Sequence, residues 1–274
     1  RLRKLHLDGN QLSGTIPESL LTALNVLQNL YIGSNRLTGD IPESITALAQ
    51  LKVLSLSHNQ LGGRVPETIG KLTKLTSLDL HSNKLTYVIP EGISALARLK
   101  HLSLVLNMLN GSIPEGIGRL GALTTLSLWG NKLTGTIPET FTRLTNLEYL
   151  SLHINKLSGT IPRGITALRK LKSLELGDND LCGSIPANLG VLKGLQTMSL
   201  YNNHLLGPIP ATVSQLTNLE TLWVSGNTLE GPLPDVSALG KLKIGWLDGN
   251  RLNGSISSAG IGMLVHLSDL VLSN

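Results

Sequence analysis

One 24-residue pattern runs through the whole chain and constrains its fold more than any other feature. It is clearest at residues 123–138, which read LTTLSLWGNKLTGTIP and reduce to L-x-x-L-x-L-x-x-N-x-L-x-G-x-I-P. A fixed period of this length is the signature of a solenoid, in which each unit buries its apolar side against its neighbours. We therefore predict a single domain over residues 1–274, with eleven full units and a truncated twelfth. The units start at Leu2, Leu27, Leu51, Leu75, Leu99, Leu123, Leu147, Leu171, Leu195, Leu219, Leu242 and Leu267.

The first part of each unit predicts a short strand. In the unit that starts at Leu123, Leu126 and Leu128 alternate inward, whereas Ser127 and Trp129 point outward. Stacked units would pair these strands in parallel about 4.8 Å apart. The Ile-Pro that closes the pattern then opens a return segment, because proline suits the first turn of a short helix.

An asparagine and a glycine recur after each strand. Interior turns leave backbone groups that water cannot reach, and an amide side chain offers both donors and an acceptor. We therefore predict a structural ladder, formed by Asn35, Asn59, Asn83, Asn107, Asn131, Asn155, Asn179, Asn203 and Asn227, with Asn10 and Asn250 at equivalent positions. The glycine permits a tight turn with positive φ. Tyr87 replaces it in the fourth unit, where we expect a distorted turn.

Composition and charge argue against several classes of function. The net charge of +5 is spread along the chain without a basic block, so we expect no nucleic-acid partner. No apolar run approaches the roughly 20 residues of a membrane span, so we expect no direct membrane insertion. Cys182 is the single cysteine and cannot form an intrachain disulfide. The seven histidines show no metal-ligand spacing, and we assign no metal and no cofactor.

Two arrangements could suggest chemistry. Asp79 and His81 lie two residues apart on one strand, with Ser57 or Ser103 on a neighbouring strand. A hydrolase would also need convergent geometry and an oxyanion hole, and an open sheet encloses no pocket. The G-x-G-x-x-G match at 116–121 falls on a return segment of the repeat and lacks the βαβ context of a dinucleotide site. We predict no enzymatic activity.

The outward strand positions are the candidate ligand-binding residues. Most carry serine or another small residue, so large or charged side chains there are not required by the fold. Exposed tyrosine and tryptophan dominate binding energy at interfaces. Asp178 and Asp248 add acidic groups that could take a cationic partner group. The alternative is that Trp223 and Trp246 only shield the end of the coil or pack on each other. The candidates are Tyr31, Asp79, His101, Trp129, Tyr149, His153, Glu175, Tyr201, Trp223 and Trp246.

Two N-glycosylation sequons occur, at Asn110-Gly-Ser and Asn253-Gly-Ser. Both place asparagine immediately before the turn glycine of the repeat. They would be exposed and available for glycosylation in an extracellular protein.

The pattern resembles leucine-rich repeats, and its L-x-G-x-I-P half resembles the plant-specific subclass of receptor-like kinases, receptor-like proteins and polygalacturonase-inhibiting proteins. The resemblance covers essentially all 274 residues. It implies an α/β repeat solenoid, a right-handed curved superhelix with a parallel β-sheet on its concave face and short helices or turns on its convex face. The cysteine-containing caps usual in that family are not visible here. We therefore expect part of a longer polypeptide.

The resemblance implies a recognition module that binds a protein or peptide ligand, or a glycan, without catalysis. The leading interpretation is the ligand-binding region of a receptor-like protein or kinase at the cell surface. Two alternatives stay open. One is a cytoplasmic interaction arm of a GTPase or an immune-receptor-like protein, and the other is a secreted inhibitor of a cell-wall hydrolase. No feature of the sequence indicates an oligomeric state.

Overall fold

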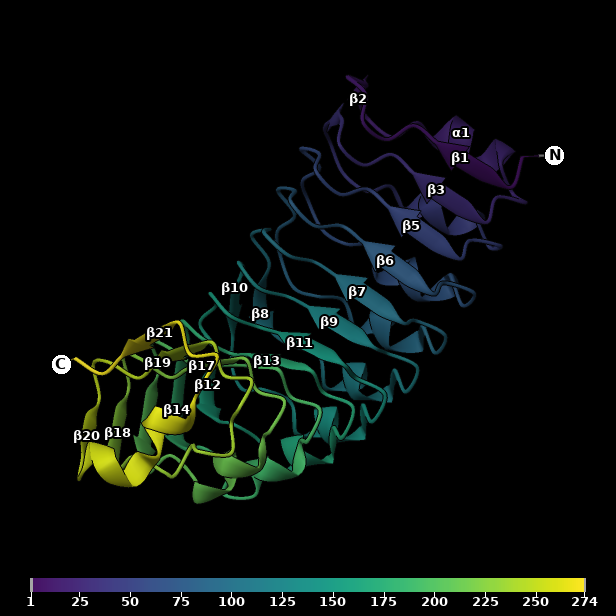
Figure 1. The fold of residues 1–274 in the computed structure, drawn as a ribbon. Helices are drawn as coiled ribbons and strands as arrows, with labels where there is room; N and C mark the ends of the chain where they lie inside the picture. The colour runs from purple at the N-terminus through teal and green to yellow at the C-terminus, as the bar shows by residue number, and fades with distance from the viewer. Residues whose placement is uncertain (1, 274) are drawn as a thin grey trace. The chain divides into compact units, whose positions relative to one another are not determined.

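The computed structural model describes residues 2–273 and is shown in Figure 1. The chain forms two compact units, Arg1–Thr134 and Gly135–Asn274, and each is described by itself. Within each unit, one turn of the chain corresponds to one sequence repeat, so equivalent residues of successive repeats lie side by side.

The first unit carries a parallel sheet whose strands follow the order of the chain (Figure 1). Each strand of this sheet is only three residues long. It begins at one outward position, passes through one inward residue and ends at the next outward position. In the described part of this unit, its strands are β1 (Lys4–His6), β3 (Asn29–Tyr31), β5 (Val53–Ser55), β6 (Ser77–Asp79), β7 (His101–Ser103) and β9 (Thr125–Ser127).

The second unit repeats this arrangement. Its parallel sheet is formed by β11 (Tyr149–Ser151), β13 (Ser173–Glu175), β15 (Thr197–Ser199), β17 (Thr221–Trp223), β19 (Ile244–Trp246) and β21 (Asp269–Val271). The register aligns equivalent repeat positions, so that Glu175 lies opposite Ser199 and Trp223 lies opposite Trp246. Outward side chains of neighbouring repeats therefore stand next to one another.

A second set of parallel strands follows the ladder asparagines, and the repeat pattern did not predict it. In the first unit β2 (Ser13–Gly14) pairs with β4 (Arg36–Leu37), and β8 (Asn110–Ser112) pairs with β10 (Lys132–Thr134). In the second unit a five-stranded sheet is formed by β12 (Ser158–Thr160), β14 (Asp180–Ser184), β16 (His204–Gly207), β18 (Thr228–Pro232) and β20 (Arg251–Asn253). These strands show little alternation, because one buried leucine is followed by the turn glycine.

The return segments are short helices, as the Ile-Pro pattern predicts. Pro42 directly precedes the first of the 3-10 helices and has a φ of −72°. The Pro42 carbonyl accepts a hydrogen bond from the N–H of Ile45 at 2.9 Å. The elements are α1 (Glu18–Ala23), η1 (Glu43–Ala47), η2 (Glu67–Lys71), η3 (Glu91–Ala95), η4 (Glu115–Arg119), η5 (Glu139–Arg143), η6 (Arg163–Ala167), η7 (Leu189–Val191), η8 (Ala211–Gln215), η9 (Ile256–Ala259) and η10 (Ile261–Met263).

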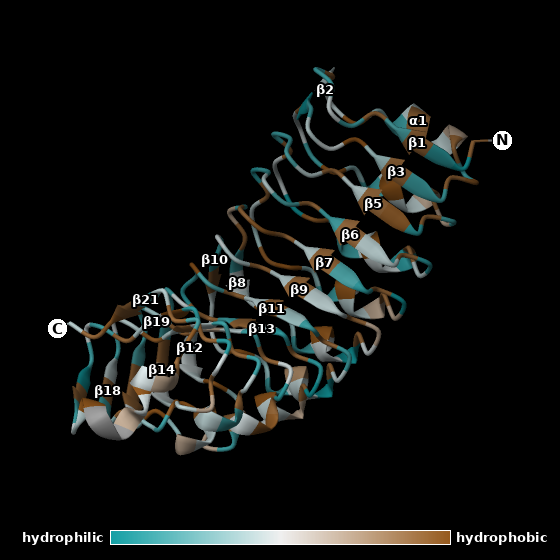
Figure 2. Cartoon of the chain, in the orientation of Figure 1, coloured by the Kyte–Doolittle hydropathy of each residue, from teal (hydrophilic) through white to brown (hydrophobic). Residues whose placement is uncertain are grey.

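The core of each unit consists of aliphatic layers between the sheet and the return helices. Leu126 and Leu128 are fully buried, as are Ile117 and Ile165 of the return segments. Figure 2 shows apolar and polar residues alternating along the strands. Phe141, the single phenylalanine of the sequence, occupies an isoleucine position of the return segment and is fully buried.

The repeating asparagines join each repeat to the one before it. The amide nitrogen of Asn59 donates to the carbonyl of Ile32 at 2.9 Å, 27 residues back, and also to carbonyls of its own turn. Its Oδ1 accepts the N–H of Leu37 at 2.9 Å. Asn107, Asn179, Asn203 and Asn227 repeat this arrangement and are likewise buried.

The turn at Tyr87 is not distorted, and our expectation there was wrong. Tyr87 adopts a left-handed φ of 65°, close to the 69° of Gly111 at the equivalent position of the next repeat. The N–H of Asn110 donates to the Tyr87 carbonyl at 2.9 Å, so the connection to the next repeat is kept. This backbone conformation is unfavourable for a residue with a bulky side chain, but Tyr87 adopts it and is 63% exposed.

Candidate functional site

Three of the predicted outward residues meet in the second unit and form what we call the aromatic row: Tyr201, Trp223 and Trp246. The Tyr201 and Trp223 rings stack with centroids 3.8 Å apart and planes 13° apart. The Trp223 and Trp246 rings meet edge to face with centroids 4.7 Å apart. The two tryptophans thus pack on each other, yet all three side chains keep part of their surface in solvent.

Gly177 makes room for the aromatic row, and we did not identify it from the sequence. It occupies the position of Tyr201 one repeat earlier. A Cβ atom there would lie 2.2 Å from Cδ1 of the Tyr201 ring, which is far inside van der Waals contact. The ring therefore lies directly over the Gly177 backbone. A glycine among larger outward residues is the sequence signal that could have indicated this contact.

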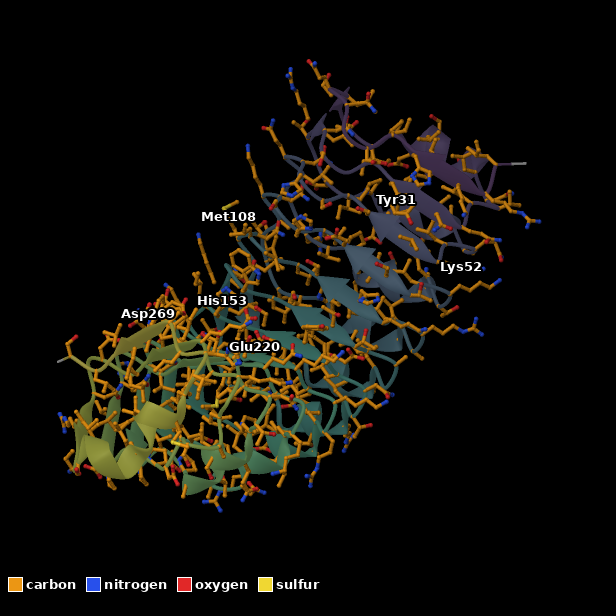
Figure 3. All side chains as sticks on the ribbon, in the orientation of Figure 1. Tyr31, Lys52, Met108, His153, Glu220 and Asp269 are labelled. Carbon is orange, nitrogen blue, oxygen red and sulfur yellow. The ribbon has the colours of Figure 1, made fainter. Side chains whose placement is uncertain are left out.

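Hydrogen bonds hold both tryptophans in place. Trp246 donates from Nε1 to Oδ2 of Asp269 on β21 at 2.7 Å (Figure 3 labels Asp269). Trp223 donates from Nε1 to the hydroxyl of Ser225. Buried or half-buried indole N–H groups usually need such a partner. Asp269 was not among the predicted residues, because the repeat pattern leaves its position unspecified.

His153 and Glu175 lie together beside this row, within the same unit. Glu175 accepts hydrogen bonds from Ser173 at 2.6 Å and from Ser151 at 3.2 Å, and lies 3.3 Å from Nδ1 of His153. Burial lowers the pKa of His153 below its usual value of 6.5, while the charges of Glu175 and Asp178 partly oppose that shift. Burial also raises the pKa of the Tyr201 hydroxyl, with further contributions from the same two carboxylates.

Tyr149 lies on β11 near a surface ion pair. The Nζ atom of Lys172 lies 5.9 Å from the centre of the Tyr149 ring and 2.7 Å from Oε2 of Glu148. The hydrogen bond and charge of Lys172 lower the pKa of the Glu148 carboxyl. Lys172 is therefore already engaged by two groups at the edge of the sheet.

In the first unit the predicted residues form separate contacts. Tyr31 stacks on His6 with ring centroids 4.4 Å apart. Asp79 lies 2.6 Å from Nδ1 of His81, whose ring meets that of His58 edge to face.

The remaining two first-unit candidates lie towards the last strand of that unit. His101 is exposed and lies 3.2 Å from the hydroxyl of Thr125. Trp129 is half-buried two residues beyond β9. The first-unit candidates thus make separate contacts, whereas in the second unit three of the candidates contact one another in the aromatic row.

Other features bear on the sequence predictions. Asn110 on β8 and Asn253 on β20 are both exposed, as a sequon must be for glycosylation. Among the described residues, no group of three or more His, Cys, Asp or Glu side chains could hold a metal ion. Over residues 2–273, no helix combines the length and the apolar character that a bilayer crossing requires.

Comparison with known families agrees with this architecture. Models described as "Leucine rich repeat" match residues 1–61, 121–181, 194–216 and 218–239, and one described as "Leucine Rich repeats (2 copies)" matches 49–91. The chain therefore belongs to the leucine-rich-repeat family. The predicted repeat solenoid with its parallel sheet is confirmed.

The solved structures that are similar to this chain include plant receptors. It is 34% identical to the plant peptide hormone receptor RGFR1, solved in complex with RGF2, with a TM-score of 0.94 over 98% of this chain and 47% of that one. It is 32% identical to the Arabidopsis receptor kinase HAESA, solved with the peptide hormone IDA and the co-receptor SERK1, with a TM-score of 0.89 over 99% of this chain and 50% of that one. The chain thus spans about half the length of these receptor structures.

One further neighbour is of a different kind. A plant ice-binding protein is 32% identical, with a TM-score of 0.76 over 92% of this chain and 81% of that one. A comparison with curated proteins finds no match. The chain is a leucine-rich-repeat module similar in fold to the ligand-binding modules of plant receptors.

Proposed function

We propose that the chain is the ligand-binding region of a receptor-like protein or kinase, and that it recognises a peptide or protein outside the cell without catalysis. The observation that carries this proposal is the aromatic row. The fold does not require large side chains at these outward positions, so their presence points to a binding role. Part-exposed tryptophan and tyrosine side chains that already make fixed contacts supply interface area at low entropic cost.

The similar structures support the same proposal. RGFR1 and HAESA were each solved with a peptide hormone, at identities of 34% and 32% to this chain. The exposed sequons at Asn110 and Asn253 fit an extracellular location. A sheet face built from six neighbouring strands can contact an extended ligand along its length rather than enclose a small one.

The proposal can be tested by screening the purified chain against a library of synthetic linear peptides, with biolayer interferometry as the readout. The double variant Trp223→Ala, Trp246→Ala should weaken any peptide that binds by about 2 kcal/mol or more, which is roughly 30-fold in Kd. Circular dichroism and the urea midpoint report whether the variant still folds.

Tyr87→Gly provides the matched control. It also removes an exposed aromatic side chain, but one that lies at a turn away from the outward strand positions, and it restores the residue that the repeat prefers there. Binding should be unchanged in this variant. If the double tryptophan variant binds every peptide as tightly as the unmodified chain, the proposed binding face is wrong.

A further inference from the structure

The outward face of the second unit's sheet is acidic, although the whole chain carries a net positive charge. Four carboxylates stand on this face or in the turns that directly follow its strands, namely those of Glu175, Asp178, Asp248 and Asp269. The outward positions of β11, β13, β15, β17, β19 and β21 carry no lysine or arginine. The complete chain has a net charge of +5, so this local acidity is not a consequence of overall composition.

Among the described residues, no lysine or arginine forms an ion pair with any of these four carboxylates. Lys172 and Lys243 each directly precede a strand, and each is paired with a glutamate of the preceding repeat. The Nζ of Lys172 lies 2.7 Å from Glu148, and the Nζ of Lys243 lies 2.6 Å from Glu220 (Figure 3 labels Glu220). Glu175 also lies 3.3 Å from Nδ1 of His153, but burial lowers the pKa of that histidine and so disfavours its charged form. The four carboxylates of the face are therefore available to a cation from outside.

Two of these carboxylates are fixed in position before any ligand arrives. Glu175 is held by the hydroxyl groups of Ser151 and Ser173, and Asp269 accepts the indole N–H of Trp246. Fixed groups lose little side-chain entropy when a ligand binds, which favours affinity. Burial is the main cause of the raised pKa of Tyr201, and the charges of Asp178 and Glu175 add to it, so these two charges act on the aromatic row itself.

Aromatic rings beside fixed carboxylates form a favourable site for an organic cation. A guanidinium or ammonium group is attracted to the face of tryptophan or tyrosine, and guanidinium also pairs with carboxylate through two parallel hydrogen bonds. Strands about 4.8 Å apart spread the row over about 10 Å and the sheet of this unit over about 24 Å. About seven residues of an extended peptide cover the latter length.

We propose that this face docks an extended basic peptide segment, whose arginine or lysine side chains lie against the aromatic row and pair with the flanking carboxylates. The inference rests on the proposed function and specifies the chemistry of the ligand. Charge complementarity selects this occupant, because an acidic segment would meet four like charges and a neutral one would bring no cation to pair with them.

Three end-blocked, fluorescein-labelled decapeptides test the inference: five Arg-Ser repeats, five citrulline-Ser repeats and five Glu-Ser repeats. Citrulline keeps the shape of arginine without its charge. Fluorescence anisotropy with the purified chain should show the arginine peptide binding at least about tenfold more tightly than the citrulline peptide. Affinity for the arginine peptide should fall as salt is added, and the glutamate peptide should not bind.

Isosteric variants locate the site without changing the shape of the face. Glu175→Gln with Asp178→Asn should weaken the arginine peptide about tenfold and reduce the salt dependence of its binding. Asp180→Asn with Glu230→Gln is the matched control, because these exposed carboxylates lie on β14 and β18, in the other sheet of the same unit. This control should leave affinity unchanged.

Several results would overturn the inference. They are absence of binding by the arginine peptide, equal affinity for the arginine and citrulline peptides, or equal losses in the carboxylate and control variants. Spermine binding as tightly as the arginine peptide would exclude the extended-peptide assignment. If these tests fail while Trp223→Ala with Trp246→Ala still weakens binding of a library peptide, the proposed receptor function stands and only the cationic ligand is wrong.

Discussion

The side-chain amide of Asn203 makes four hydrogen bonds, but its partners depend on it unequally. Its nitrogen donates to the carbonyls of Leu176, Leu200 and Tyr201 at 3.0–3.2 Å. Each of these carbonyls also accepts from a second donor, namely the Asn179 amide, the Asn227 amide and the Asp178 N–H respectively. The fourth partner is the N–H of fully buried Leu181, which donates to Oδ1 at 2.9 Å.

Asn203→Ala should therefore cost about 2–4 kcal/mol of unfolding free energy. Leaving the buried Leu181 N–H without an acceptor costs about 1–3 kcal/mol, and the three carbonyls lose one of their two donors at a smaller cost each. Asn203→Asp should cost more. It keeps the acceptor for Leu181 but turns an oxygen towards three carbonyls and buries a charge at a position only 5% exposed.

Urea unfolding followed by circular dichroism measures the stability change, and amide hydrogen exchange at Leu181 measures its local origin. Asn10→Ala is the matched control, because exposed Asn10 donates only to the carbonyls of Leu7 and Asp8, and the Leu7 carbonyl also accepts from Asn35. It should cost less than about 1 kcal/mol. Equal losses in Asn203→Ala and Asn10→Ala, or unchanged exchange at Leu181, would refute the reasoning.

Three further outcomes follow from other residues. Phe141→Ala should destabilise the chain by about 3–5 kcal/mol in urea unfolding and Phe141→Leu by less than about 1.5 kcal/mol, because only alanine leaves a large cavity; similar losses would argue against a tightly packed site. Burial lowers the folded-state pKa of His153 below the usual 6.5, so the unfolded chain binds more protons and stability should fall as the pH drops below about 6.5. His153→Gln should flatten that part of the pH profile, and an unaltered profile would assign it to other groups. Secreted expression should add glycan mass at Asn110 and Asn253 that peptide-N-glycosidase removes, whereas an unmodified mass at both would contradict an extracellular location.

Much of the fold follows from the periodicity alone. Leu126, Leu128 and Ile117 are buried where the pattern places them, because a fixed period leaves one way to stack the units. The second set of strands was missed since segments such as Ser158–Thr160 contain a glycine and no alternation. The Tyr87 turn was misjudged because the neighbouring repeats impose the backbone conformation that glycine normally provides.

Less of the candidate site could be foreseen. The sequence placed Tyr201, Trp223 and Trp246 at outward positions, but their mutual packing depends on ring orientation. Tyr201 stands at a different strand position from the two tryptophans, and its ring stacks on Trp223 only because Gly177 has no side chain. The partner of Trp246, Asp269, lies on the next strand at a position that the repeat pattern leaves unspecified.

The offsets of the asparagine hydrogen bonds have a consequence for how such a chain evolves. Asn59 reaches back 27 residues to Ile32 and accepts from Leu37, 22 residues back, and Asn107 does the same with Leu80 and Leu85. Each of these hydrogen bonds between repeats thus connects a repeat only to its immediate predecessor. If unequal crossing-over adds or removes one whole repeat, the same asparagine hydrogen bonds can form between the two repeats that become neighbours. A lineage can therefore lengthen or shorten its recognition surface in steps of about 4.8 Å while the interior chemistry stays the same.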